Sequence, residues 1–143
     1  MGMDWHAMTQ ALIEDIRTNS GKVTSGPFQG RQVLLLTTTG ARTGEARTTP
    51  LVFSREEGRY VIGASMNGAP THPAWYHNLV KNPVVTVEAD GDTFQARATV
   101  VASEQRQRMY DQHAELHSSF KEYEALTERV IPMVTLERLA PAD

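Results

Sequence analysis

The 143-residue chain contains no cysteine, and this absence excludes several kinds of chemistry. The protein has no disulfide, no thiol nucleophile and no cysteine-ligated zinc. A domain of this size buries about two-thirds of its unfolded surface, so it needs no such cross-link. The lack of cysteine also fits an intracellular protein. We therefore predict a single cytoplasmic domain over residues 1–143, with an N-terminal helix in residues 1–20 and the main body in residues 31–139.

Strong charge of one sign and long apolar runs are absent as well. The formal net charge is −3, which argues against a broad nucleic-acid-binding face. No apolar run approaches the ~20 residues of a membrane span. The first residues, MGMDWH, lack the basic and apolar regions of a signal peptide.

Six segments have the composition of strands, and short turns join most of them. A run of leucines makes the first segment typical of a strand buried on both faces, and Asp90-Gly91 marks a hairpin. Pro50 restricts part of the second segment to a sheet edge or a bulge. A doubly wound parallel fold would need helices that are missing here, so we predict a mainly β (α+β) antiparallel barrel. The segments are residues 31–39, 47–54, 59–64, 84–88, 93–101 and 132–139.

Helices are expected to decorate this barrel. The first has Trp5, Met8, Leu12 and Ile16 at helical spacing, with Asp4 as its N-cap. It is expected to pack on the protein body, because its acidic residues oppose contact with anionic lipid. A short helix begins with Pro73 in its first turn, is capped by Thr71 or His72, and ends before Asn82-Pro83. Two further helices are predicted over residues 103–116 and 120–129.

A first motif, TTTGARTGEARTTP, occupies residues 37–50 and is dense in hydroxyls, glycine and arginine. Arg42 and Arg47 flank a glycine-bounded turn, so both can reach one phosphate or carboxylate. The motif is neither a Walker loop nor a dinucleotide-binding fingerprint. The alternative is a solvated hairpin whose arginines pair with Glu45, and residue types alone do not decide between the two.

A second motif, GAPTHPAWYHNL, covers residues 68–79 at the predicted start of the short helix. Exposed amides at a helix start suit an anion or an acceptor-rich ring. Trp75 and Tyr76 either line a site for a flat ring or pack the helix on the barrel. Paired carboxylates at useful spacing and a nucleophile elbow are missing, so a bound cofactor is expected to supply the chemistry.

Histidine provides little support for a metal site. His113 and His117 lie one helical turn apart in the segment HAELH. The segment lacks the glutamate next to the first histidine that a zinc protease requires, and no third ligand is evident. We predict no metal.

Three segments together, LLLTTTGARTGEARTTPL, GAPTHPAWYHNL and ERVIPMVTLER, resemble the deazaflavin (F420)-dependent nitroreductase family of actinobacteria. The similarity runs from about Val33 to Leu139, in the family's order. It implies an FMN-binding-like split β-barrel. It also implies hydride transfer from reduced F420 (F420H2) to an electron-poor acceptor. Such acceptors include activated C=C bonds of enones or coumarin-like lactones, quinones and nitroaromatics.

The resemblance also implies roles for individual residues. Arg42 and Arg47 would hold the phosphate and polyglutamate tail of F420, while Ser65 would orient the acceptor. Tyr123 or a water would supply a proton, so Ser65 and Tyr123 are the candidate catalytic residues. The candidate cofactor-binding residues are Ala41, Arg42, Thr43, Arg47, Thr48, Thr49, Pro50, Leu51, Val52, Gly63, Ala64, Ser65, Met66, Ala74, Trp75, Tyr76, His77 and Asn78.

The substrate pocket implied in the same way consists of His117, Phe120 and Tyr123. Two positions depart from the nitroimidazole-activating members of the family. Met66 stands where a lysine is expected, and Phe120 cannot donate a hydrogen bond where those members have a tyrosine. We therefore expect flat, activated enones to be better acceptors than bulky nitroimidazoles.

Two other functions are open at this point. FMN or haem could occupy a related split barrel, although FMN has one phosphate and needs fewer cations than two arginines provide. A non-catalytic module could instead sequester F420 or a quinone without turnover. The expected partners are a small-molecule electron acceptor and no nucleic acid, and the chain is either a monomer or a homodimer.

Overall fold

A computed structural model describes residues 5–140 of the chain, with the side chains of Trp5 and Asn67 left out. Within these residues the chain forms seven β-strands, four α-helices and one 3-10 turn. The helical elements are α1 (Trp5–Thr18), η1 (Met66–Gly68), α2 (Ala74–Lys81), α3 (Ser103–Leu116) and α4 (Ser119–Leu126). The strands are β1 (Val33–Thr39), β2 (Ala46–Val52), β3 (Ser54–Glu56), β4 (Arg59–Gly63), β5 (Val84–Ala89), β6 (Asp92–Val100) and β7 (Met133–Arg138).

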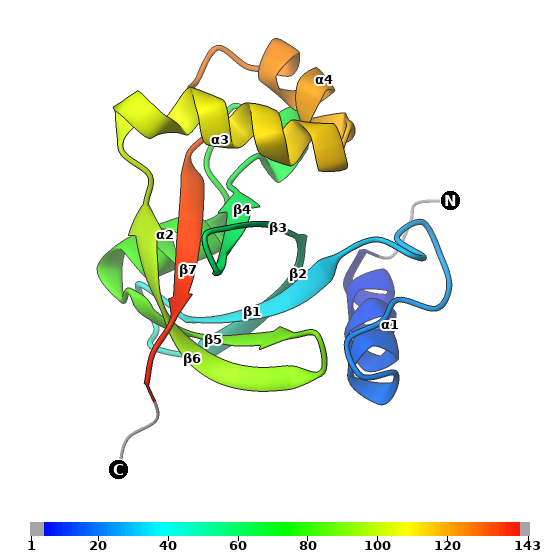
Figure 1. Ribbon diagram of the computed structural model, residues 1–143. Coiled ribbons are helices and arrows are strands. Elements are labelled where there is room, and N and C mark those ends of the chain that lie inside the picture. The colour runs from blue at the N-terminus through cyan, green and yellow to red at the C-terminus, as the bar shows by residue number, and fades with distance from the viewer. Residues whose placement is uncertain (1–4, 141–143) are drawn as a thin grey trace.

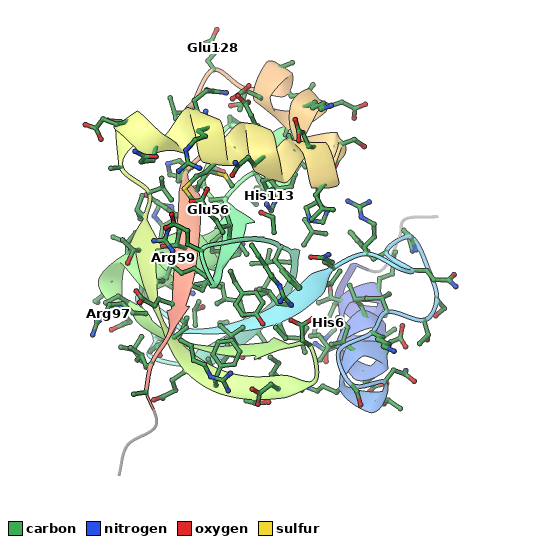
Figure 2. The ribbon with its side chains drawn as sticks, viewed as in Figure 1. His6, Glu56, Arg59, Arg97, His113 and Glu128 are labelled. Atoms are coloured by element: carbon green, nitrogen blue, oxygen red, sulfur yellow. The ribbon has the colours of Figure 1, made fainter. Side chains whose placement is uncertain are left out.

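The strands form one curled sheet in the order β2-β1-β5-β6-β7-β4-β3, and each neighbouring pair is antiparallel. This confirms the predicted antiparallel split barrel. Helix α1 lies beside β1 and β2, whereas α3 and α4 lie together over one end of the sheet (Figure 1). His113 lies on the side of α3 that faces the strands (Figure 2). No helix within residues 5–140 has the length and apolar character to cross a membrane.

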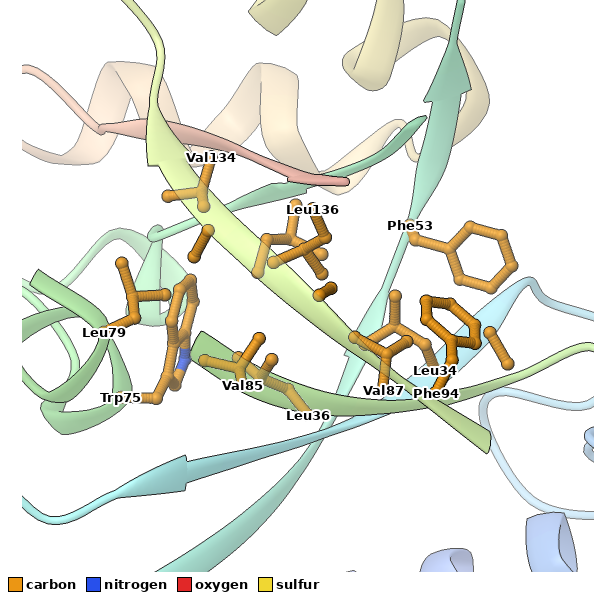
Figure 3. Packing of buried hydrophobic residues seen from close by; sticks show 14 of the residues in the cluster. Leu34, Leu36, Phe53, Trp75, Leu79, Val85, Val87, Phe94, Val134 and Leu136 are labelled. Carbon is orange, nitrogen blue, oxygen red and sulfur yellow. The ribbon is translucent and has the colours of Figure 1, made fainter. Parts of the chain in front are cut away.

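The buried side chains follow the strand pattern. In β5 and β6 alternate residues point inward, and Val85, Val87 and Phe94 join the central cluster. Trp75 and Leu79 of α2 close the other end of this cluster (Figure 3). Strand β1 is buried on both faces, as predicted. One face turns into the barrel, and the other packs against Ile13 and Ile16 of α1.

The second predicted strand is interrupted in the structure. Residues 47–54 do not form one strand, because the chain leaves β2 after Val52 and re-pairs as β3 with β4. Phe53 lies between the two strands with its side chain buried, and its N–H donates to the carbonyl of Gln32. Pro50 lies in β2 at the edge of the sheet, where a missing N–H is tolerated.

Two details of the predicted helices are wrong. The N-cap of α2 is Pro73 itself, in an extended conformation and with no side-chain cap, so neither Thr71 nor His72 caps the helix. The last helix ends at Leu126 rather than at residue 129, and residues 127–132 connect it to β7. The predicted N-cap Asp4 lies outside the described residues.

Candidate functional site

Two adjoining hollows open between α1, β2 and the start of α2. The larger, which we call the polar hollow, has a volume of about 1160 Å³, and the smaller, the apolar hollow, has about 600 Å³. Thr9, Thr48, Thr49 and Trp75 line both of them. The two hollows therefore form one groove, with a polar and an apolar part.

Cationic side chains surround the polar hollow. Arg42 reaches it from the β1–β2 loop, Arg47 from the start of β2 and Arg17 from α1. His6 and His77 also line it, and among the described residues no aspartate or glutamate does. Side chains of this kind, together with the hydroxyls of the threonines, favour a ligand with several negative charges.

Two of these arginines have carboxylate partners on the protein surface. Arg47 lies 3.1 Å from Glu45, and both side chains are more than 60% exposed. This is the pairing that the solvated-hairpin interpretation anticipated for Arg47. Arg17 donates from Nε and Nη2 to the two carboxylate oxygens of Glu88, at 2.9 Å each. Exposed pairs of this type contribute only about 0–1 kcal/mol, so an anionic ligand can replace the carboxylate.

The loop that carries Arg42 is held in place by α2. The N–H of Ala41 donates to Oδ1 of Asn78 at 2.9 Å, and Nδ2 of Asn78 donates to the hydroxyl of Thr38. Lys81 donates to the carbonyl of Ala41 at 2.7 Å. Asn78 is buried, so both ends of its amide serve the protein. Ala41 and Asn78 thus line the hollow, and the Ala41 N–H and the Asn78 amide hold the loop in its conformation.

Several separate segments line the apolar hollow. β2 contributes Pro50, Leu51 and Val52, and the end of β4 contributes Gly63, followed by Ser65 and Met66. All of these were predicted to contact the cofactor. Val33 of β1 and, at the start of α2, Pro73 and Trp75 also line it. The remaining walls come from α1 and from the loop around Phe28, which sequence reasoning missed. These residues are Met8, Thr9, Ala11, Leu12 and Asp15 of α1, and Ser25, Gly26, Pro27 and Phe28 of the loop.

Met66 has an unusual backbone conformation at this wall. Its φ angle is 46°, in the left-handed region that residues other than glycine seldom adopt. Its side chain is 50% exposed, whereas the preceding Ser65 is buried. Such a conformation costs roughly 1–3 kcal/mol and persists only where neighbouring contacts stabilise it.

Trp75 of the second motif packs α2 on the barrel and also faces the groove. Its side chain is only 7% exposed and belongs to the central cluster, yet it also lines both hollows. Tyr76 packs against the same cluster and lies 4.8 Å from the ring of His72. Tyr76 and the fully buried Ala64 line neither hollow, so they lie behind the predicted site.

The three residues predicted to form the substrate pocket lie behind the groove. Phe120 is buried in a second cluster beneath α3 and α4, and Tyr123 packs against that cluster. A Cβ atom at Gly63 would lie 2.5 Å from the Phe120 ring, so Phe120 packs on the back of the apolar hollow's wall. His117 is 1% exposed. The structure therefore does not bring these side chains to either hollow.

His113 of α3 and His117, which directly follows this helix, are hydrogen-bonded inside the protein. His117 must carry its proton on Nε2, because that nitrogen lies 2.8 Å from the Phe53 carbonyl, which only accepts. Its Nδ1 then accepts from Arg31 at 2.9 Å, and Nδ1 of His113 lies 2.8 Å from the hydroxyl of Ser54. Burial is the main reason that the pKa of His113 is lowered to about 3, with His117 adding to the effect. Within residues 5–140 no group of three or more possible ligands could hold a metal ion.

Comparison with known proteins gives a consistent result. A model of the F420H(2)-dependent quinone reductase family matches residues 9–138. The F420H(2)-dependent quinone reductase Rv1261c of Mycobacterium tuberculosis is 38% identical over 108 residues, which cover 73% of this chain and 72% of that protein.

Solved structures agree with this match. The structure of an F420-H2 dependent reductase (FDR-A) has a TM-score of 0.68 at 35% identity, covering 75% of this chain and 95% of that one. A protein described as a domain-swapped dimer has a TM-score of 0.69 at 31% identity, covering 94% of this chain and 98% of that one. The fold is thus shared with these proteins.

Proposed function

The chain belongs to the F420H(2)-dependent quinone reductase family, and from this membership we propose that it transfers a hydride from F420H2 to an electron-poor organic acceptor. Membership makes the chain an oxidoreductase and argues against a non-catalytic binding module. A quinone is the first acceptor to consider, because quinone reduction is the activity for which the family is named. Enones, coumarin-like lactones and nitroaromatics follow as weaker candidates.

The continuous groove carries this proposal, because its two parts match the two parts of the cofactor. F420 combines a flat deazaflavin ring with a phosphate and a polyglutamate tail. The polar hollow offers Arg17, Arg42 and Arg47, and no described aspartate or glutamate lines it, which suits the anionic part. The carboxylates that pair with Arg17 and Arg47, Glu88 and Glu45, lie outside the lining. The apolar hollow joins it at Trp75 and suits the ring. FMN has one phosphate and no tail, so it would leave much of the cationic surface unpaired.

The residues of the chain have distinct tasks in this proposal. When bound, F420H2 supplies the hydride. Arg42 and Arg47 hold the anionic groups, and Pro50 to Val52 exclude water from the reacting centre. Ser65 is a buried hydroxyl on the apolar hollow, so we assign to it the orientation of the acceptor's carbonyl oxygen. Tyr123 as proton donor stays a prediction, and its backbone lies next to Gly68 rather than on the groove.

The apolar hollow also bears on the choice of acceptor. Met8, Leu12, Phe28 and Met66 line it, and three of them are large exposed apolar side chains. A flat acceptor with an apolar body buries such side chains, which favours a quinone over a small polar nitro compound.

The test of the proposal is a fluorescence titration with F420 and, in parallel, with FMN. Trp75 lines both hollows and serves as the reporter, and a Trp5→Phe variant removes the other tryptophan. We expect micromolar or tighter quenching by F420 and no saturable quenching by FMN. Menadione, a coumarin lactone and a nitroaromatic then rank the acceptors. Tight binding by FMN alone would overturn the proposed cofactor, and turnover of none of the acceptors would overturn the proposed activity.

The assembly and location of the protein complete the proposal. A relative with 31% identity is described as a domain-swapped dimer, so a homodimer is the expected state of this chain. Light scattering at several protein concentrations distinguishes it from a monomer. We also propose a cytoplasmic location, because a protein without cysteine forms no disulfide and so does not require an oxidising compartment.

A further inference from the structure

Arg129 lies on the connection between α4 and β7, outside both hollows, yet it bonds to the segment that forms one wall of the groove. Its Nε donates to the carbonyl of Ala69 at 2.9 Å. Its Nη2 donates to the carbonyls of Ala64 and Ser65, at 3.1 and 2.8 Å. Its Nη1 lies 2.8 Å from Nδ1 of His72. One guanidinium thus contacts four residues between positions 64 and 72.

These residues connect the end of β4 to the start of α2. Ser65 and Met66 line the apolar hollow, and the chain then continues through Pro73, which also lines it, to Trp75. The connection contains the left-handed Met66 and a left-handed Gly68, with φ angles of 46° and 80°. A backbone of this kind relaxes unless contacts on both sides hold it. The Arg129 contacts lie on both sides, at Ala64 and Ser65 before the turn and at Ala69 after it.

The chemistry of the contacts explains why arginine stands at this position. Three backbone carbonyls accept from one side chain, and a planar guanidinium offers five N–H donors in a fixed fork. His72 is the fourth contact, and since guanidinium nitrogens only donate, its Nδ1 must be unprotonated. An ammonium group at the end of a flexible lysine chain cannot reach all four acceptors in this arrangement.

We propose that Arg129 is a positioning residue for the cofactor site, holding the carbonyls of Ala64, Ser65 and Ala69 so that Ser65 and Met66 keep their places on the apolar hollow. The proposal rests on the proposed function, since the groove is taken to bind F420. Arg129 touches neither hollow and acts only through this backbone segment.

Arg106 offers a matched control on the same corner of the protein. Its Nε donates to the carbonyl of Ile131, its Nη1 donates to Glu124, and its guanidinium lies over the Tyr110 ring. It therefore supports the same connection into β7 but has no bond to residues 64–72 among its described contacts. Arg129→Lys and Arg129→Met are compared with Arg106→Lys and Arg106→Met.

Two measurements separate positioning from general stability. The first is the Kd for F420, followed by quenching. The second is hydrogen exchange, without ligand, at the amides of Gly68 and Ala69, which donate within the turn to Ser65 and Met66. We expect Arg129→Lys to raise the Kd at least tenfold and to speed both exchange rates at least tenfold. Arg106→Lys should change the Kd and both exchange rates by less than twofold, although its melting temperature falls by a similar amount.

Several results would overturn the proposal. These are unchanged exchange in Arg129→Lys, equal changes in the Arg106 variants, or unfolding of both Arg129 variants, which would make Arg129 a residue of general stability. Failure of the wild-type protein to bind F420 would count against the proposed function. In that case the exchange rates alone still decide whether Arg129 holds the turn.

Discussion

The groove and the cluster beneath α3 contain similar kinds of side chain but differ in what those side chains can do. Arg42 and Arg47 are exposed at the groove, and the ion pair of Arg47 with Glu45 is open to solvent. His113 and His117 are fully buried, and three of their four ring nitrogens have protein partners. Polar groups already satisfied inside the protein have little left for a ligand. Residue type therefore indicates a site only where solvent and ligand can reach it.

The largest effect is expected at Phe120, where substitution should lower stability without changing acceptor binding. Phe120→Ala should lower the free energy of unfolding by about 3–5 kcal/mol, because it leaves a cavity beneath α3. The milder Phe120→Leu should keep the KM for a quinone within about twofold, because the ring lies behind Gly63 rather than on the hollow. Urea denaturation and steady-state kinetics measure the two quantities. A large change in KM for Phe120→Leu at wild-type stability would return Phe120 to the substrate pocket.

Acidic pH should lower the free energy of unfolding through the buried His113. The pKa of His113 is lowered to about 3, chiefly by burial, whereas an unfolded histidine titrates near 6.5. Below pH 6.5 the unfolded state therefore binds a proton at His113 that the folded state does not bind. The free energy of unfolding falls as the pH drops toward 3. The slope is about 1.4 kcal/mol of unfolding free energy per pH unit for this one group.

Urea denaturation between pH 7 and pH 4.5 checks this expectation. His113→Gln, which has no group that titrates in the range, should flatten the slope. The exposed His77→Gln is the control and should leave the slope as it is. An unchanged slope in His113→Gln would show that other groups cause the acid sensitivity.

The two arginines of the first motif should affect binding without affecting folding. Arg42→Ala and Arg47→Ala should each weaken F420 binding by about 1–3 kcal/mol, the range for lost hydrogen bonds to a charged group. Because both side chains are exposed, the melting temperature should stay within a few degrees. A deazaflavin without phosphate or glutamates is the control ligand and should bind both variants as it binds the wild type. Equal losses of affinity for F420 and for the control deazaflavin would mean that the arginines shape the ring site instead.

The smallest effect is expected at Arg17. Arg17→Gln removes an exposed cation that lines the polar hollow and pairs with Glu88, so F420 should bind less tightly by about 0.5–1 kcal/mol. Raising the salt concentration should shrink the difference between variant and wild type. A titration at two ionic strengths measures both. A larger loss of F420 affinity that does not depend on salt would mean that breaking the Arg17–Glu88 ion pair displaces α1.

Much of the fold could be predicted because local rules agree with the final structure. The alternating residues of β5 and β6 and the Asp90-Gly91 turn predict the hairpin, in which Ala89 pairs with Asp92 and both turn residues have positive φ. The two motifs likewise predict the segments that line the groove. The break at Phe53 could not be predicted. Residues before it pair with β1 and residues after it pair with β4, but the composition of the run from Ala46 to Ser54 does not change at that point.

The sequence by itself determined most of the strands, the hairpin, the arginine-bearing motif and the resemblance that points to F420, because each depends on residues close together in the chain. The tertiary structure decided which polar residues are exposed. His117 and Arg31 are 86 positions apart, and only folding brings them into the contact that satisfies His117. It also brought α1 and the Phe28 loop to the groove and Arg129 to the turn after β4. No periodicity records such contacts, since they depend on how whole elements pack.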